Sequence, residues 1–428
     1  MSRLLKQAQQ RVEKVLRLVQ TLKDDDFPHS DSVDTLTFVE KLFVSHREIL
    51  SQTKPDVNTQ RVIRNNCQSA LDDVFVYLPV IGYVARSTDV VGALELHSPL
   101  HRIVKQIVGP KARLLLTSDW QYSPTTYLCP QLVQEGLVLV NLPASEADNG
   151  LTMPLAGHEI GHSVWYAKGL EGYFFDLVDE TLVSSIASAG NFETFKRHFG
   201  PIEIEQIDDL AGRPYWEQAS DWAISQCEET FCDFVGLLLF RESYIYAFES
   251  LLSPGGGYRD PSYPPIRARV RHLLDLAGEL GILIDANYLE SFQDETSELR
   301  EKDAFLAEMS DYALEALTAE LASHAQKSLI DYPTDAHSDN ERRRVISAYE
   351  RTTPINGGVH VMNLIAATWE VENSDIRIWD TRYPQLADKP EERSRILNEL
   401  FLKSLEILEI ENIQKEMKEK EDTPVRTQ

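Results

Sequence analysis

Two histidines separated by one helical turn give this chain its clearest chemical signal. The segment reads His158-Glu159-Ile160-Gly161-His162, with a carboxylate directly after the first imidazole. On an α-helix, residues i and i+4 point to the same side, so both imidazoles can bind one metal ion. Two neutral imidazoles supply half of a tetrahedral zinc shell, and a neighbouring carboxylate can act as general base for a water molecule. We therefore predict a catalytic Zn²⁺ site with His158 and His162 as ligands and Glu159 as the base.

The alternative is a helix that carries two histidines by coincidence. With 11 His and 68 acidic residues in 428 positions, chance yields about 0.05 such five-residue matches in the chain. The pattern therefore favours a metal site over coincidence.

A second helical segment carries the candidates for the third ligand. The stretch from Tyr215 to Leu252 is predicted to be helical throughout, and it contains Glu228, Glu229 and Asp233. Glu229 and Asp233 are one turn apart, so one carboxylate can bind the metal while the other orients a ligand histidine. We predict Glu229 as the third ligand and Asp233 as the supporting residue. Glu228 is the competing ligand, and a solvated acidic helix face is the alternative for all three.

These two motifs resemble those of the gluzincin metallopeptidases, in which a His-Glu-x-x-His helix is completed by a later Glu-x-x-x-Asp helix. The separation of 67 residues between His162 and Glu229 (229 − 162) is similar to the layout of the CAAX prenyl protease type. That type continues with a His-Pro-x-x-x-x-Arg segment. Tyr263, Pro264 and Arg269 stand in the matching positions, with tyrosine in place of the usual histidine. The likeness covers roughly residues 137 to 274, which is under a third of the chain.

The resemblance implies a zinc-dependent endopeptidase. In that family the position of Tyr263 helps to stabilise the oxyanion on the substrate carbonyl, and a tyrosine hydroxyl can donate the same hydrogen bond. Arg269 is expected among the residues that support the metal ligands. The alternative for Tyr263 is an ordinary rigid turn ahead of a helix.

The expected reaction is hydrolysis of peptide bonds in an intracellular protein or peptide. Glu159 would take a proton from water at the metal and return it to the leaving amine. The alternative is a zinc-stabilised regulatory or binding module without turnover, whose helical ends engage a protein partner. Glu159 favours the enzyme, because a purely structural zinc site has no use for a base at that position.

The elements that must position these residues predict an α+β protein that is mostly helical. A small sheet precedes the zinc helix, with strands over Lys111–Ser118 and Leu137–Leu142, and the second strand is our candidate edge for binding an extended substrate. Glycine-rich Ser253–Tyr258 is predicted to be a flexible loop that crosses the mouth of the site. Further helices are predicted over 3–23, 32–51, 58–84, 92–107, 267–283, 285–325, 340–349, 358–371 and 391–420.

We predict four parts along the chain: an N-terminal helical segment at 1–57, a zinc metallopeptidase core at 58–270, a C-terminal helical domain at 271–422, and a disordered tail at 423–428. The last domain offers no chemistry of its own.

Composition narrows the class of partners and the compartment. The net charge of −26 argues against a nucleic-acid groove, because phosphate contacts need clustered Lys and Arg. No stretch reaches the roughly 18 to 20 apolar residues that span a bilayer, and the first residues lack the apolar core of a secretory signal. Four cysteines without a framework spacing fit a reducing compartment, and Cys227 and Cys232 are predicted to be small buried residues rather than zinc ligands. We expect a cytoplasmic protein without membrane insertion.

Overall fold

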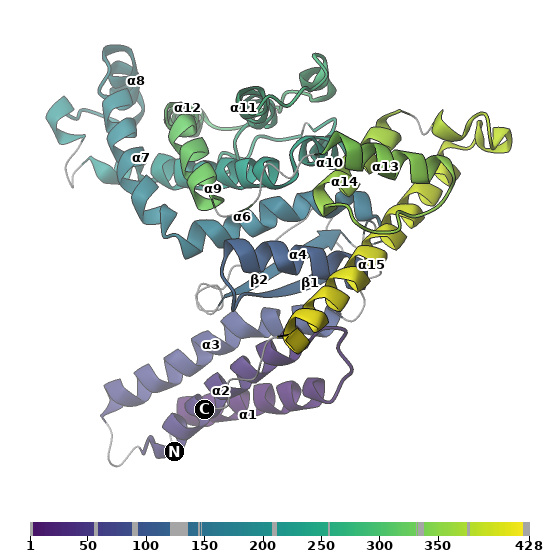
Figure 1. Ribbon diagram of the computed structural model, residues 1–428. Helices are drawn as coiled ribbons and strands as arrows, with labels where there is room; N and C mark the ends of the chain where they lie inside the picture. The colour runs from purple at the N-terminus through teal and green to yellow at the C-terminus, as the bar shows by residue number, and fades with distance from the viewer. Residues whose placement is uncertain are drawn as a thin grey trace. The chain divides into compact units, whose positions relative to one another are not determined.

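The computed structural model describes residues 3–54, 59–87, 93–119, 136–143, 146, 148–207, 212–255, 257–330, 332, 338–374 and 377–422. This part of the chain is mostly helical and contains one small parallel sheet, which confirms the predicted α+β class (Figure 1). Among these residues, none of the helices combines the length and the apolar composition that a membrane crossing needs. The chain divides into two compact units, Met1–Lys105 with Gly109–Asp148, and Gln106–Val108 with Asn149–Gln428.

In the first unit, helices pack against the small sheet, and the two share one hydrophobic core. Its two strands run parallel, with Arg113 opposite Leu137. Val12, Phe43 and Tyr77 are buried in the core that they share with the sheet. The elements are α1 (Arg3–Lys23), α2 (Ser30–Gln52), α3 (Gln60–Arg86), α4 (Ala93–Ile107), β1 (Arg113–Asp119) and β2 (Leu137–Pro143).

This core also bears on the predicted division of the chain. Both α1 and α2 pack against α3, so the segment predicted at 1–57 shares its core with residues that follow it. The candidate substrate-binding strand, β2, belongs to this first unit, whereas the predicted metal ligands belong to the second. The division between residues 148 and 149 falls inside the predicted core of 58–270.

The second unit is built around one long buried helix, α9, against which α6, α7 and α12 pack. Its helices are α6 (Ala156–Ala167), α7 (Leu170–Ile186), α8 (Ala189–Phe199), α9 (Arg213–Phe240), α10 (Glu242–Leu252), α11 (Ile266–Glu279), α12 (Glu301–Ser328), α13 (Asp339–Glu350), α14 (Val361–Asn373) and α15 (Pro390–Asp422). Short 3₁₀ turns lie at η2 (Gly150–Leu155), η3 (Ile204–Gln206), η4 (Tyr288–Ser291), η5 (Arg377–Trp379) and η6 (Pro384–Leu386).

The helix with the two histidines begins after a capped 3₁₀ turn. The Asn149 side chain accepts a hydrogen bond from the Leu151 amide, and the Thr152 hydroxyl donates to the Asn149 carbonyl. The first contact satisfies one of the backbone amides that a helix start leaves without a partner. Because Ala156 begins α6, the histidines lie in its first two turns.

The predicted continuous helix from Tyr215 to Leu252 is broken at Arg241. This residue has φ 51° and ψ −133°, a backbone conformation that ends α9 and starts α10. The turn brings α10 back against α9. The break matters for the site, because α10 carries Tyr244.

The helix predicted from residue 285 begins only at Glu301. The segment before it pairs with the predicted flexible loop, through hydrogen bonds from the Gln293 amide to the Pro254 carbonyl (2.7 Å) and from the Thr296 amide to the Gly257 carbonyl (2.9 Å). The loop is therefore anchored on both sides of Gly256, which lies outside the described residues. The tail at 423–428 also lies outside them.

Candidate metal centre

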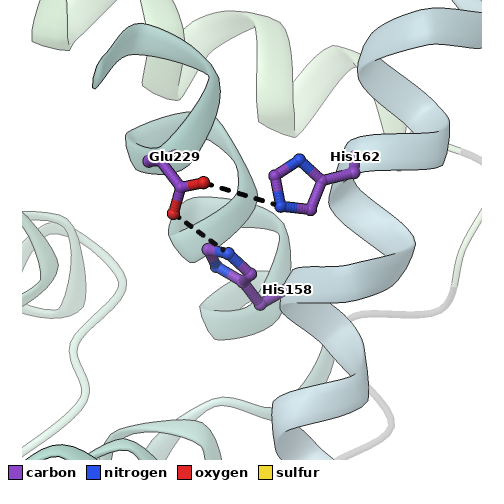
Figure 2. A group of neighbouring side chains, drawn as sticks. All are labelled: His158, His162 and Glu229. Carbon is purple, nitrogen blue, oxygen red and sulfur yellow. Dashed lines mark ion pairs between the residues drawn. The ribbon is translucent and has the colours of Figure 1, made fainter. Parts of the chain in front are cut away.

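Two helices bring His158, His162 and Glu229 together (Figure 2). The imidazole rings, both on α6, have centroids 5.0 Å apart and stand nearly perpendicular, at 83°. Glu229 reaches them from α9, with 3.4 Å between His158 Nε2 and Glu229 Oε2 and 3.8 Å between His162 Nε2 and Glu229 Oε1. One ligand atom from each residue lies within 4.8 Å of the others, so the three residues lie close enough to hold a metal ion.

The two imidazole nitrogens face different oxygens of Glu229. Zinc bonds of about 2.0–2.1 Å place neighbouring ligand atoms about 3.3 to 3.4 Å apart. The observed separations of 3.4 and 3.8 Å are near that value. The three side chains therefore lie close enough to hold a metal ion.

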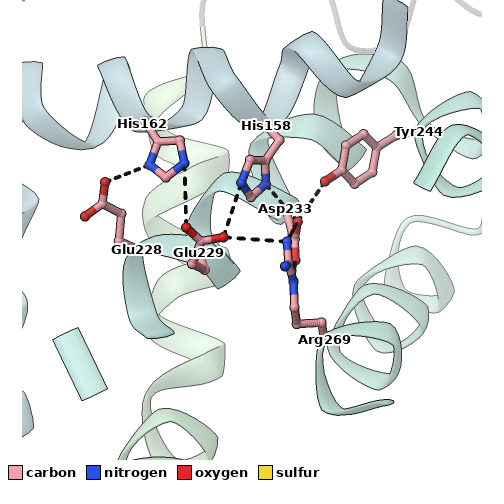
Figure 3. A network of polar contacts seen from close by, with 7 residues as sticks. All are labelled: His158, His162, Glu228, Glu229, Asp233, Tyr244 and Arg269. Carbon is pink, nitrogen blue, oxygen red and sulfur yellow. Dashed lines mark hydrogen bonds and ion pairs between the residues drawn. The ribbon is translucent and has the colours of Figure 1, made fainter. Parts of the chain in front are cut away.

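A carboxylate stands behind each histidine (Figure 3). Asp233 Oδ1 lies 2.9 Å from Nδ1 of His158, and Glu228 Oε1 lies 2.7 Å from Nδ1 of His162. Each Nδ1–H can donate to its carboxylate, which leaves Nε2 as the ligand atom on the side of Glu229. Glu228, the competing candidate for third ligand, thus contacts the outer nitrogen of His162.

Asp233 is itself held by two further residues. Arg269 on α11 donates two hydrogen bonds to it, each of 2.8 Å, and lies 3.7 Å from Glu229. Tyr244 on α10 donates a third, of 2.7 Å. Arg269 was predicted to support the ligands, whereas sequence reasoning did not find Tyr244. The Tyr244 ring packs on Gly236, where an added Cβ would lie 2.4 Å from the ring.

The charged side chains around the candidate metal site shift one another's pKa values. Burial disfavours a charged His158, but its hydrogen bonds to Asp233 and Glu229 raise the pKa of this imidazole to about 10. Burial would raise the pKa of Glu229, but the hydrogen bond and charge of His158 and the charge of Arg269 lower it to about 2. Both shifts favour the charged forms, an imidazolium at His158 beside the carboxylate of Glu229.

Glu159 occupies an unusual environment for a carboxylate. The residue is 3% exposed, and its Oε2 has no hydrogen-bond partner in the described part of the chain. Burial raises the pKa of Glu159, while the nearby charges of His158 and His162 lower it. The position directly beside a candidate ligand thus carries a buried carboxylate with one oxygen unpaired.

Glycines set the distance between the two helices. An added Cβ at Gly161 would lie 2.7 Å from the Cα atom of Cys232, and one at Gly157 would lie 2.9 Å from the Cα atom of Gly236. The backbones of α6 and α9 therefore meet directly. Cys232 and Cys227 are buried free thiols, which confirms that these cysteines pack as small buried residues.

Tyr263 is placed differently from the other predicted site residues. It is 47% exposed, and its hydroxyl makes no hydrogen bond to the residues that the structure describes. The negative charge of Glu229 raises the pKa of Tyr263, so the phenol lies within the field of the metal-binding group. Tyr263 is thus linked to the group by the charge of Glu229, and among the described residues no hydrogen bond joins its hydroxyl to a candidate ligand.

Comparisons with protein families, with curated proteins and with solved structures gave no match to this chain. The likeness to the gluzincins therefore rests on the motifs alone and stays a prediction.

Proposed function

We propose that this chain is a zinc-dependent endopeptidase that hydrolyses peptide bonds of a protein or peptide substrate. The observation that carries the proposal is the buried carboxylate of Glu159, whose Oε2 has no partner among the described residues. Burying such a group is costly, and a site that serves only to stabilise the fold gains nothing from it. A general base beside the open position of a metal site, by contrast, needs a carboxylate oxygen that is available to accept a proton.

The donor set favours zinc among biological metals. Two imidazole nitrogens and one carboxylate oxygen are ligands of catalytic zinc sites that keep a position open for reactants. Mg²⁺ and Ca²⁺ prefer shells made of oxygen atoms, which His158 and His162 do not offer. The carboxylate behind each imidazole further supports a metal site, because such partners orient ligand histidines.

Each residue has a distinct role in the proposed reaction. Bound zinc would polarise the substrate carbonyl and lower the pKa of water to about 7. Glu159 accepts the proton of the attacking water and delivers it to the leaving amine. The Tyr263 hydroxyl donates a hydrogen bond to the developing oxyanion. Asp233 and Arg269 hold His158 and Glu229 in place.

The substitution Glu159→Gln tests the proposal, because it keeps the shape of the side chain and removes its basicity. Zinc-loaded wild type is incubated with a peptide library, cleavage is followed by mass spectrometry, and metal content is measured by atomic emission. We expect the variant to keep zinc and to lose cleavage. Glu308→Gln, a change at an exposed position on α12, should cleave like the wild type.

Cleavage by Glu159→Gln at the wild-type rate would remove this residue from the role of base. Zinc binding by a wild type that cleaves no peptide would contradict the endopeptidase and favour a metal-stabilised binding module.

A further inference from the structure

Tyr263 combines an exposed phenol with a tightly held backbone. Its hydroxyl has no hydrogen-bond partner within the described residues, yet its amide donates to the Asp260 carbonyl at 3.1 Å. Ser262 closes the same turn, because its amide and hydroxyl both donate to the Asp260 carboxylate, at 3.0 and 2.7 Å. We call residues Asp260 to Tyr263 the tyrosine turn.

Two side chains bind the carbonyl groups of the tyrosine turn. Nη1 of Arg259 donates to the carbonyls of Asp260 and Tyr263. Nε2 of Gln226 donates to the Pro261 carbonyl at 2.8 Å. Three of the four carbonyls in the turn are therefore fixed by side chains, so the backbone on which the phenol stands has little freedom.

Asp311 on α12 joins these two side chains. Its Oδ1 accepts a hydrogen bond from Nη2 of Arg259 at 2.5 Å and another from Nε2 of Gln226 at 2.9 Å. Asp311 thereby neutralises the guanidinium of Arg259, which is only 9% exposed, and orients the amide of Gln226. Without this carboxylate, both donors would lose a shared acceptor in a buried setting.

The same contacts connect the tyrosine turn to the metal-binding group. Gln226 lies on α9 three residues before Glu229, so the two side chains are neighbours on one helix. On the other side of Tyr263, two prolines lead into α11, whose Arg269 binds Asp233. The chain on each side of Tyr263 is thus connected to α9. Before it, the Pro261 carbonyl accepts from Gln226 of α9, and after it, Arg269 binds Asp233 of α9.

We propose that Asp311 is a positioning residue for the proposed peptidase reaction: through Gln226 and Arg259 it holds the Tyr263 phenol where the substrate carbonyl develops its negative charge. The inference rests on the proposed function. Its physical basis is that an oxyanion donor works only when it is fixed in advance, and a misplacement of about 1 Å can cost about 100-fold in rate.

A double-mutant cycle tests this role. Asp311→Ala is measured in the wild type and in Tyr263→Phe, with kcat and KM determined on one cleaved peptide and zinc content checked in all four proteins. We expect Asp311→Ala to lower kcat about 10- to 100-fold in the wild type, with little change in KM or zinc. In Tyr263→Phe, which has no hydroxyl to position, the same change should lower kcat less than threefold.

Two further variants separate positioning from general damage. Asp311→Asn keeps the size and an acceptor oxygen but removes the charge, so it should give a smaller fall in kcat than Asp311→Ala. Glu308→Ala, one turn away on α12 and exposed, should leave kcat unchanged. An equal fall in kcat for Asp311→Ala with and without the Tyr263 hydroxyl would overturn the proposal.

A second measurement does not depend on turnover. The chain has 16 tyrosines, so the ¹⁹F resonance of Tyr263 in 3-fluorotyrosine-labelled protein is assigned from its loss in Tyr263→Phe. We expect Asp311→Ala to move this resonance toward that of free fluorotyrosine. An unchanged resonance would overturn the positioning role even in an active enzyme. A moved resonance in a protein that cleaves no peptide would reject the proposed function and retain the anchoring contact.

Discussion

Gly161 on α6 lies directly against Cys232 on α9, with space for no side chain between them: an added Cβ would stand 2.7 Å from the Cys232 Cα atom. The candidate ligands lie close to this contact. His158 and His162 flank Gly161, and Glu229 lies less than one turn before Cys232. The closeness of the two backbones therefore sets the separations of 3.4 and 3.8 Å between imidazole and carboxylate atoms.

Replacing Gly161 by alanine should weaken metal binding. The added methyl group must push the two helix backbones apart, because neither can move aside as a flexible side chain can. We expect at least 10-fold weaker zinc affinity, measured by competition with a chromogenic chelator, and a loss of about 1–3 kcal/mol in stability.

Gly172→Ala is the matched control. This helical glycine on α7 has no atom within 4 Å of an added Cβ, so the change should leave zinc affinity unaltered and stabilise the helix by about 0.5–1 kcal/mol. Wild-type affinity in Gly161→Ala would show that the helix contact does not control the ligand geometry.

Removing the carboxylate of Glu228, the competing candidate for the third ligand, should also weaken the metal site, although it contacts the outer nitrogen of His162. Its Oε1 lies 2.7 Å from Nδ1 of His162 and fixes which ring nitrogen carries the proton. Loss of such a partner costs about 10- to 100-fold in metal affinity. We expect that range for Glu228→Ala by the same chelator competition. Glu217→Ala, on the exposed side of α9, should bind zinc as the wild type does, and equal affinities for the two variants would refute the role of Glu228.

Zinc binding should release a proton from His158. The pKa of this imidazole is raised to about 10, so at pH 7.5 it is protonated in the metal-free protein, while a metal ligand must be neutral. Affinity should therefore rise by about tenfold for each pH unit between 6 and 9. Calorimetry in two buffers of different ionisation enthalpy measures the release directly.

The matched variant for this measurement is Asp233→Asn, which removes the negative charge that holds the proton on His158. We expect it to release less than half as many protons at pH 7.5. Binding with no proton release in the wild type would mean that His158 is neutral before the metal arrives.

The three candidate ligands and Asp233 could be predicted because a helix fixes the relative directions of side chains one turn apart. His158 with His162, and Glu229 with Asp233, are each one turn apart, so their spacing alone places each pair on one helix side. The choice between Glu228 and Glu229 was harder. It depends on how α9 is rotated toward α6, and that rotation follows from the glycine contacts between them.

Tyr244 could not be found from the sequence. It reaches Asp233 only because the chain reverses at Arg241, a non-glycine residue with positive φ, and nothing in the local sequence marks that break. Most helices were predictable from their apolar periodicity. The exceptions include α7 and α8, for which the sequence analysis predicts no helix. Residues 292–300 are not helical, and the amides of Gln293 and Thr296 bond to carbonyls of a distant loop, a pairing that local propensity does not encode.

A buried histidine in the first unit predicts that acid destabilises this unit. His97 stacks on His29 with ring centroids 3.5 Å apart and lies 2.9 Å from the Leu114 carbonyl. Burial, followed by the neighbouring charges of His29, His101 and Lys105, lowers the pKa of His97 to about 3. The unfolded chain, with a histidine pKa of about 6.5, then takes up the proton first. Stability is complete above pH 6.5 and falls by up to about 1.4 kcal/mol per pH unit from there toward pH 3.

Hydrogen exchange of the amides in α4 and β1 measures this loss, because it reports the free energy of opening in the first unit separately from the second. We expect protection to fall between pH 7 and pH 5, after correction for the intrinsic exchange rate. His97→Gln removes the titrating group and retains an amide that can donate to the Leu114 carbonyl, so its protection should change less over the same range. His198→Gln, in the second unit, should behave as the wild type. A fall of equal size in His97→Gln would assign the acid sensitivity to other groups.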